Sequence, residues 1–307
     1  MELNLEIVTT PLRPAATVVM LRDAPAGLEV FLMKRHALSD VLGGAYVFPG
    51  GKVDAVDAEL DMAAHLDQPL QALHAGLNEA DIDERTAGGL YVAALREAFE
   101  ESGVLMAQGM AGQRVDCARA AALLREGHGF NAVLAQMALR LQTRSLAPWT
   151  RWITPTSPSV MNKRFDTRFF VAAVPAGQVA VHDDHETTAS IWLSPRAALA
   201  QYWDGRIALA PPQIMSLAHL SHHASVGSVL MQARSRLPPV IQPEPFDQDG
   251  GRVICYPGDA RHSVCEPAMP GPTRLYYRNK RFEPGGGFDR LFDAGAGTPQ
   301  GEGINKG

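Results

Sequence analysis

Arg96-Glu97-Ala98-Phe99-Glu100-Glu101-Ser102-Gly103-Val104 combines three glutamates with apolar residues at helical spacing. It closes an apolar run over residues 91–105, which predicts a helix that ends at Gly103. On a helical wheel the apolar side chains fall on one side and the three glutamates on the other. Like charges at helical spacing repel by tenths of a kcal/mol per pair, so the pattern does not favour the helix by itself.

A divalent cation would turn that repulsion into ligation. Carboxylate oxygens suit Mg²⁺ or Mn²⁺, so Glu97, Glu100 and Glu101 are candidate metal ligands. The alternative is a solvated acidic face without a function.

The order Arg-Glu-x-x-Glu-Glu-x-Gly resembles the second half of the Nudix box. The full pattern is Gly, five residues, Glu, seven residues, then Arg-Glu-apolar-x-Glu-Glu-x-Gly-apolar. Ala98 and Val104 fill the two apolar positions, and Phe48-Pro49-Gly50-Gly51 resembles the turn that opens the box. The resemblance implies an α/β fold, the Nudix α/β/α sandwich with a mixed sheet, over about residues 12–205.

The box is interrupted in this chain. Counting from Gly51 places its first glutamate at Asp57, whereas counting back from Arg96 places it at Gly88. The first acidic position is therefore either Asp57 or absent. We expect a helical insertion over residues 53–88 and infer that it forms a lid or wall beside the site.

The rest of the chain predicts a Nudix domain over 12–235, a β-rich C-terminal extension over 236–283 and a flexible, Gly-rich tail over 284–307. Apolar runs and turn residues predict further elements. The expected strands are 15–21, 28–34, 149–154, 164–174, 190–193, 252–256 and 273–278. The expected helices are 57–66, 69–75, 116–125, 131–142, 196–203 and a pair within 211–234 broken near Gly227.

Composition excludes several classes of protein. The 307 residues carry a formal net charge of -5, so no nucleic-acid partner is expected. No apolar run is long enough to span a membrane, and neither terminus reads as a secretory or peroxisomal address, so we expect a cytoplasmic protein. Three cysteines do not make a disulfide framework. The sequence leaves a homodimer open.

The resemblance implies metal-dependent hydrolysis of a diphosphate linked to another moiety. Glu97, Glu100 and Glu101 would bind Mg²⁺ or Mn²⁺, and Arg96 would pair with a neighbouring glutamate and fix its rotamer. A further acid is expected shortly before the strand with Trp192, and Glu186 fits that place best within 182–186. The candidate catalytic residues are thus Glu100, Glu186 and Arg96.

Arg35, Gly44 and the Phe-Pro-Gly-Gly turn match the signature of Nudix coenzyme A diphosphatases, whereas His36 and Asp40 depart from it. The insertion, the stretch 164–170 and the trailing extension together resemble the animal peroxisomal branch of acyl-coenzyme A diphosphatases. The expected substrate contacts are Arg35, Phe48, Gly50, Gly51 and Arg164, with Lys34, Lys163 and Arg168 as further cations.

Two alternatives stand beside a coenzyme A or acyl-coenzyme A diphosphatase. One is an ADP-ribose or nucleotide-sugar pyrophosphatase, and the other is a non-catalytic Nudix module that senses a nucleotide. A sensing module can lose the glutamates, whereas this chain keeps Glu97, Glu100 and Glu101.

Overall fold

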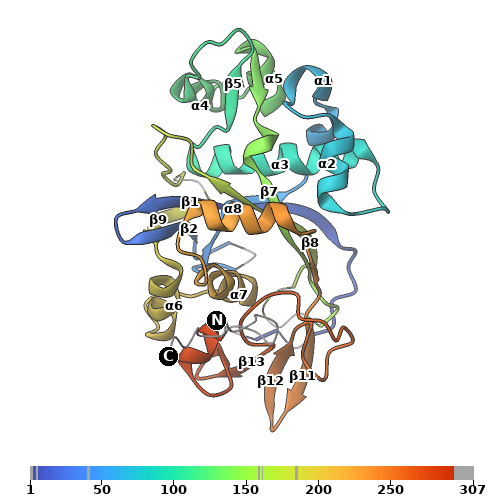
Figure 1. Ribbon diagram of the computed structural model, residues 1–307, viewed down its shortest axis with the longest axis vertical. Helices are drawn as coiled ribbons and strands as arrows, with labels where there is room; N and C mark the ends of the chain where they lie inside the picture. The colour runs from blue at the N-terminus through green and yellow to red at the C-terminus, as the bar shows by residue number, and fades with distance from the viewer. Residues whose placement is uncertain are drawn as a thin grey trace, which may run out of the picture.

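A mixed β-sheet forms the centre of the computed structural model, which describes residues 3–4, 6–39, 42–157, 160, 162–183 and 186–293 (Figure 1). Strands β1 (Arg13–Ala24) and β2 (Gly27–Arg35) form the expected hairpin. β1 also pairs in parallel with β8 (Phe165–Ala173). Parallel strands are usually buried on both faces, and β1 and β8 lie at the centre of the sheet.

The strand order of the sheet is β10-β7-β8-β1-β2-β3. β4 pairs with the start of β1, and β9 pairs with β2. Pairs β1–β8 and β10–β7 are parallel, and the other pairs are antiparallel, which makes the sheet mixed. The remaining strands of the sheet are β3 (Tyr46–Val47), β4 (Gly50–Lys52), β7 (Ala147–Ile153), β9 (Thr187–Leu193) and β10 (Val240–Ile241).

Alternating side chains bury both faces of the sheet. Val18 and Met20 of β1 face the long helix α3 (Glu84–Ser102), whereas Val19 and Leu21 point into the opposite core. That second core is covered by α6 (Pro195–Trp203), α7 (Pro211–Leu220) and α8 (Val226–Ser235). Figure 1 shows α3 above the sheet and α6 and α7 below it. The predicted α/β/α sandwich is confirmed.

Helix α3 is longer than its apolar run predicted. It begins at Glu84, because the side chain of Asp83 caps it by accepting a hydrogen bond from the Thr86 N–H at 2.6 Å. It ends as predicted at Gly103, whose φ of 70° lies in the left-handed region that favours glycine.

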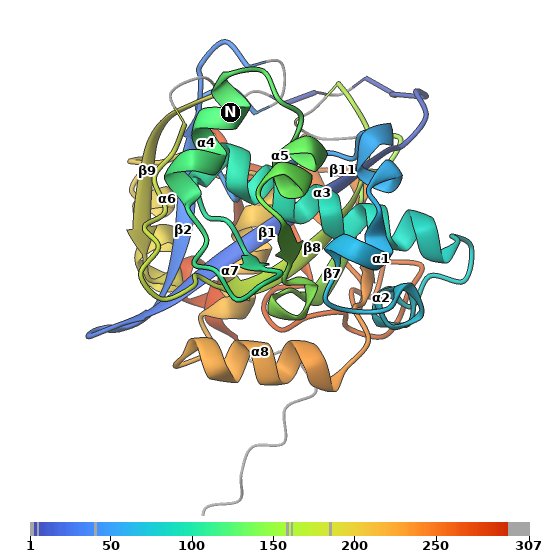
Figure 2. The same cartoon turned by 90° about the horizontal axis from the view of Figure 1, so that it is seen from above.

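Short helices make up the insertion, as expected. They are η1 (Ala55–Glu59), α1 (Met62–His65) and α2 (Leu70–Leu77), and Figure 2 shows α1 and α2 beside one end of α3. Glu79 fixes the insertion to the sheet, because this buried carboxylate pairs with Arg151 at 2.9 Å and with Arg168. The partners come from β7 and β8, so the insertion is tied to these two strands of the sheet.

The expected helix over 131–142 is correct only in its first half. α5 (Phe130–Gln136) ends early, Ala138 takes a positive φ of 48°, and β6 (Leu139–Leu141) follows. β6 pairs with β5 (Ala107–Gly109), and this tertiary pairing overrides the helical spacing of the apolar residues. α4 (Cys117–Arg125) lies where a helix was expected. The pair within 211–234 is broken at residues 221–225, before Gly227.

The extension joins the domain through β10, which pairs with β7. It then forms a four-stranded antiparallel sheet of β11 (Glu244–Gln248), β12 (Gly251–Cys255), β13 (Arg274–Arg278) and β14 (Arg281–Pro284). The segment expected to be a flexible tail begins with Pro284, the last residue of β14, and continues into a turn of helix, η3 (Phe288–Phe292). Leu291 is buried there, and Phe292 packs under Arg196. Residues 294–307 lie outside the described part of the chain. Among the described residues, no helix is long and apolar enough to cross a membrane.

Candidate active site

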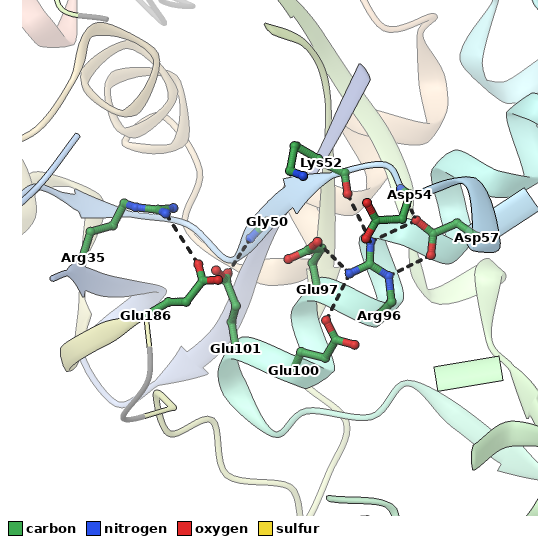
Figure 3. Close-up of polar contacts among 10 residues, drawn as sticks. All are labelled: Arg35, Gly50, Lys52, Asp54, Asp57, Arg96, Glu97, Glu100, Glu101 and Glu186. Atoms are coloured by element: carbon green, nitrogen blue, oxygen red, sulfur yellow. Dashed lines mark hydrogen bonds and ion pairs between the residues drawn. The ribbon is translucent and has the colours of Figure 1, made fainter. Parts of the chain in front are cut away.

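Arg96 is the centre of the polar cluster on α3 (Figure 3). Its guanidinium donates to Asp57 at 2.7 and 2.9 Å, to Glu97 at 2.7 Å and to Glu100 at 3.0 Å. It also donates to the carbonyl oxygen of Lys52 at 3.1 Å. The planar, five-donor guanidinium is thus fully used in holding carboxylates, a role that an ammonium group could not fill.

Asp57 is fully buried and holds Arg96 through both carboxylate oxygens. Its Oδ2 also accepts a hydrogen bond from the Asp54 N–H at 2.8 Å. Of the two alternatives from the sequence, the geometry therefore favours Asp57 as the first acidic position of the box. The interruption then begins after Asp57, and η1 belongs to the site as well as to the insertion.

The two glycines at 50 and 51 allow strand β4 to approach α3 closely. The Gly50 N–H donates to Glu101 Oε2 at 2.7 Å. A Cβ atom on Gly51 would lie 2.6 Å from the carboxyl group of Glu97, and one on Gly50 would lie 2.5 Å from the Ala16 carbonyl oxygen. A side chain on Gly50 would clash with the backbone of β1, whereas one on Gly51 would displace the carboxyl group of Glu97.

Burial perturbs the glutamates on this face of α3. Desolvation raises the pKa of Glu101 to about 8 and the pKa of Glu97 to about 7, and it also raises the pKa of Glu100. Arg96 opposes the shift at Glu97 and Glu100, and the Gly50 N–H opposes it at Glu101. One arginine among these carboxylates leaves an excess of negative charge, which a bound cation would relieve.

Arg35 and Glu186 form a second polar group beside Glu101 (Figure 3). Arg35 Nη2 lies 3.5 Å from Glu186 Oε2, and the Glu186 side chain is 64% exposed. The pairing of β2 with β9 shifts register between Lys34 and Arg35, and such a bulge re-aims side chains near a site. Arg35 Nε is buried and has no hydrogen-bond partner among the described residues.

These two groups meet in a cavity of about 430 Å³. Its polar lining includes Arg35, Lys52, Glu97, Glu101 and Glu186. The remainder is largely apolar and draws on β7, β8, α7 and the C-terminal extension: Trp152, Ile153, Phe165, Phe169, Pro211, Pro212, Pro243, Pro245 and Ile254. Charged groups for a diphosphate and walls for an organic moiety thus share one cavity.

The structure brings most of the predicted residues to this cavity. Phe48, Gly50 and Gly51 line it with Arg35, although Phe48 is 2% exposed and packs edge-on against Phe169. Arg164 lies elsewhere and donates to the carbonyl oxygens of Thr154 and Thr10.

Two other predicted polar side chains have structural partners. Arg168 pairs with Glu79 of the insertion and with Asp166 of its own strand in a buried ion-pair network. Asp183, the nearby alternative to Glu186, accepts a hydrogen bond from the Thr187 hydroxyl at 3.0 Å. Asp184 and His185 lie outside the described residues.

Joint binding of one metal ion by Glu97, Glu100 and Glu101 would require their side chains to turn. Among the residues that the structure describes, no three acidic, histidine or cysteine side chains converge closely enough to hold an ion. Glu97 and Glu100 instead face Arg96, and Glu101 faces Gly50. The residue types nevertheless fit Mg²⁺ or Mn²⁺, because Mg²⁺ binds through one or two carboxylates plus waters and substrate phosphates.

Several lining residues were missed by the sequence reasoning. The Lys52 carbonyl contributes through its backbone, and Trp152, Gln213 and Ile254 come from segments distant from the box. Only the Phe-Pro-Gly-Gly turn pointed to the neighbourhood of Lys52. Gln213 is supplied by α7, and Ile254 comes near Trp152 because β10 pairs with β7. The two apolar residues of β10 lie in a Pro-rich segment, and nothing in the sequence indicated that they would pair with β7.

Comparison with known proteins places this geometry in a family. The model of the NUDT19 Nudix domain family matches residues 12–220. The acyl-coenzyme A diphosphatase NUDT19 of Xenopus laevis is 27% identical over 308 residues, covering 86% of this chain and 80% of the relative. The human protein of the same name is 26% identical over 260 residues, covering 71% and 67%. A Nudix hydrolase crystal structure from Alicyclobacillus acidocaldarius is 29% identical with a TM-score of 0.60, covering 75% of this chain and 99% of that one. The chain therefore belongs to the NUDT19 Nudix domain family and is a Nudix hydrolase.

Proposed function

We propose that the chain hydrolyses the diphosphate bond of coenzyme A or acyl-coenzyme A. The products would be 3′-phosphoadenosine 5′-phosphate and 4′-phosphopantetheine or its acyl form. The observation that carries the proposal is the cavity in which Glu97, Glu101 and Arg35 adjoin a largely apolar lining. Support also comes from the frog and human relatives, both named acyl-coenzyme A diphosphatases.

Mg²⁺ or Mn²⁺ is the proposed cofactor, held by Glu97, Glu100 and Glu101. A bound ion would neutralise the diphosphate and lower the pKa of a water molecule. Arg96 acts as a positioning residue, because it holds Glu97 and Glu100 and is itself held by Asp57.

Arg35 is placed to bind a diphosphate oxygen, since its buried Nε has no partner among the described residues. Glu186 lines the same cavity and would accept the proton of the attacking water as general base. The water oxygen then bonds to phosphorus, and the bond from phosphorus to the bridging oxygen breaks. Gly50 and Gly51 admit the close approach of the carboxylates, Phe48 forms part of the wall, and the substrate contact of Arg164 stays a prediction.

The test replaces the glutamates on α3. Glu100→Gln and Glu101→Gln should each lower kcat at least about a hundredfold, the scale of a lost electrostatic group at a reaction centre. Glu84→Gln serves as the control, because it lies in the first turn of the same helix, about 24 Å away at 1.5 Å per residue. Near-normal turnover in both site variants, with unchanged metal dependence, would contradict the assignment.

ADP-ribose, nucleotide-sugar and ligand-sensing functions are the alternatives that a substrate panel separates. The cytoplasmic location and the homodimer stay predictions from the sequence. Cell fractionation tests the first, and light scattering of the purified protein tests the second.

A further inference from the structure

Residues from four neighbouring strands form the floor of the cavity in one continuous row. Trp152 of β7 pairs with Thr167 of β8, Thr167 with Ala15 of β1, and Ala15 with Lys52 of β4. Paired residues point to the same face of a sheet, and all four line the cavity. Adjacent strands lie about 4.8 Å apart, so the row is roughly 14 Å long.

The two ends of this row differ in chemistry. The Lys52 end adjoins Gly50 and Gly51, where Glu97 and Glu101 reach the cavity. The Trp152 end adjoins the C-terminal extension, because β10 pairs with Arg151 and Trp152 and the chain then continues into β11. Pro243, Pro245 and Ile254 of the extension line the cavity there, and Ile254 pairs directly with Pro245.

The extension's end of the cavity suits an aliphatic chain better than a nucleobase. Proline has no N–H to donate, and isoleucine has no polar side-chain atom, so the edge of a base would leave donors and acceptors unpaired. An aliphatic chain loses no hydrogen bonds in the same place. Trp152 Nε1 and Gln213 Oε1 are buried without a partner among the described residues, and an amide offers the matching acceptor and donor.

We propose that the pantetheine arm of the substrate lies along this row and that its acyl group reaches Ile254 and Pro245. About twelve bonds separate the phosphate oxygen of the arm from its sulfur, and an extended chain advances roughly 1.2 Å per bond, which gives about 14 Å. If the diphosphate lies at the Lys52 end of the row, the thioester lies at the Trp152 end, beside the extension. Strands β11 and β12 therefore select the acyl chain. This inference rests on the proposed function.

The experiment changes the width of the cavity at the end lined by the extension and measures selectivity for acyl-chain length. Ile254→Phe narrows this end of the cavity, and Ile254→Ala widens it. The readout is the ratio of kcat/KM for dodecanoyl-coenzyme A to kcat/KM for free coenzyme A. We expect Ile254→Phe to lower this ratio at least about tenfold, because one methylene in an apolar pocket changes discrimination by that order. Ile254→Ala should change the ratio in the opposite direction.

Val253→Ala is the matched control. Val253 precedes Ile254 in β12, is equally buried, and points to the opposite face of the strand. Its truncation changes packing on the other face of β12 and should leave the ratio unchanged. If Ile254→Phe does not fold, Pro245→Phe narrows the same end from a half-buried position, and the same ratio decides.

A second measurement tests whether the variant affects binding of the nucleotide half of the substrate. Inhibition by 3′-phosphoadenosine 5′-phosphate should be equal in the wild type and in Ile254→Phe. The inference is overturned if the wild type cleaves acyl-coenzyme A and both Ile254 variants have the same kcat/KM ratio as the wild type. It is also overturned if Val253→Ala shifts the ratio as much as Ile254→Phe does. A third contrary result is weaker inhibition by the nucleotide in Ile254→Phe with an unchanged ratio. A wild type that cleaves neither coenzyme A nor its acyl forms overturns the proposed function and this inference together.

Discussion

Asp57→Asn should destabilise the protein by about 3 kcal/mol and disorder the site. The side chain keeps its shape but loses the negative charge that accepts two hydrogen bonds from Arg96, at 2.7 and 2.9 Å. Hydrogen bonds to charged groups contribute about 1.5–3 kcal/mol each, and removing one partner of a buried ion pair costs about 3–5 kcal/mol. Asparagine retains one acceptor, and Glu97 and Glu100 still face Arg96, so the lower part of that range applies.

Denaturant unfolding in the presence of a chelator measures this loss, since bound metal would otherwise stabilise the folded state. Asp54→Asn is the matched control: Asp54 lies 3.8 Å from Arg96 with its side chain 55% exposed, so its pair should contribute less than about 1 kcal/mol. Turnover should fall in Asp57→Asn, because Arg96 loses the group that fixes it. Equal unfolding free energies for the two variants would refute the role given to Asp57.

Three further predictions concern the same site. Gly51→Ala should remove most of the activity while the protein stays folded, because its Cβ would lie 2.6 Å from the Glu97 carboxyl group. Glu186→Gln should lower kcat strongly and change stability by less than about 1 kcal/mol, as at an exposed position, whereas Asp183→Asn should have a mild effect on kcat. Without metal, stability should fall as pH rises from about 5 to about 8. Burial raises the pKa of Glu97 to about 7 and of Glu101 to about 8 in the folded state, so the folded state binds more protons than the unfolded state in this range. Saturating Mg²⁺ should flatten that dependence.

Steady-state kinetics and thermal melting check these expectations. An active Gly51→Ala enzyme would show that the Glu97 side chain or β4 can move aside without loss of function. A dispensable Glu186 beside an essential Asp183 would move the base by three residues along the chain, and dispensability of both would make Glu100 the better candidate. A chelated protein that gains stability with rising pH would contradict the raised pKa values.

The sequence predicted the glutamate-bearing helix α3 because the information for it is local. Apolar spacing, the glutamate order and Gly103 all lie within one helix, and α3 carries them as expected. Asp57 could be proposed but not decided, because its contact with Arg96 spans 39 positions and a folded insertion. The segment after Gln136 was mistaken for helix because helical apolar spacing cannot report the pairing of β6 with β5.

The walls of the cavity could not be predicted for the same reason. Ile254 and Pro245 reach the site only because β10 adds to the edge of the sheet beside Trp152. Arg168 is a residue whose charge suggested a substrate contact. Its guanidinium instead pairs with the buried Glu79 of the insertion. A side chain's type fixes its chemistry, whereas its partner depends on long-range packing.

The most direct test of the proposed activity is a substrate panel with Mg²⁺ or Mn²⁺ in which the products are identified by mass. Coenzyme A, an acyl-coenzyme A, ADP-ribose and a nucleotide sugar are incubated with the wild type and with Glu101→Gln. If the chain has the proposed activity, the wild type converts coenzyme A or its acyl form to 3′-phosphoadenosine 5′-phosphate and the matching 4′-phosphopantetheine, and Glu101→Gln loses this activity. Cleavage of ADP-ribose or the nucleotide sugar alone, or of no compound, would contradict it.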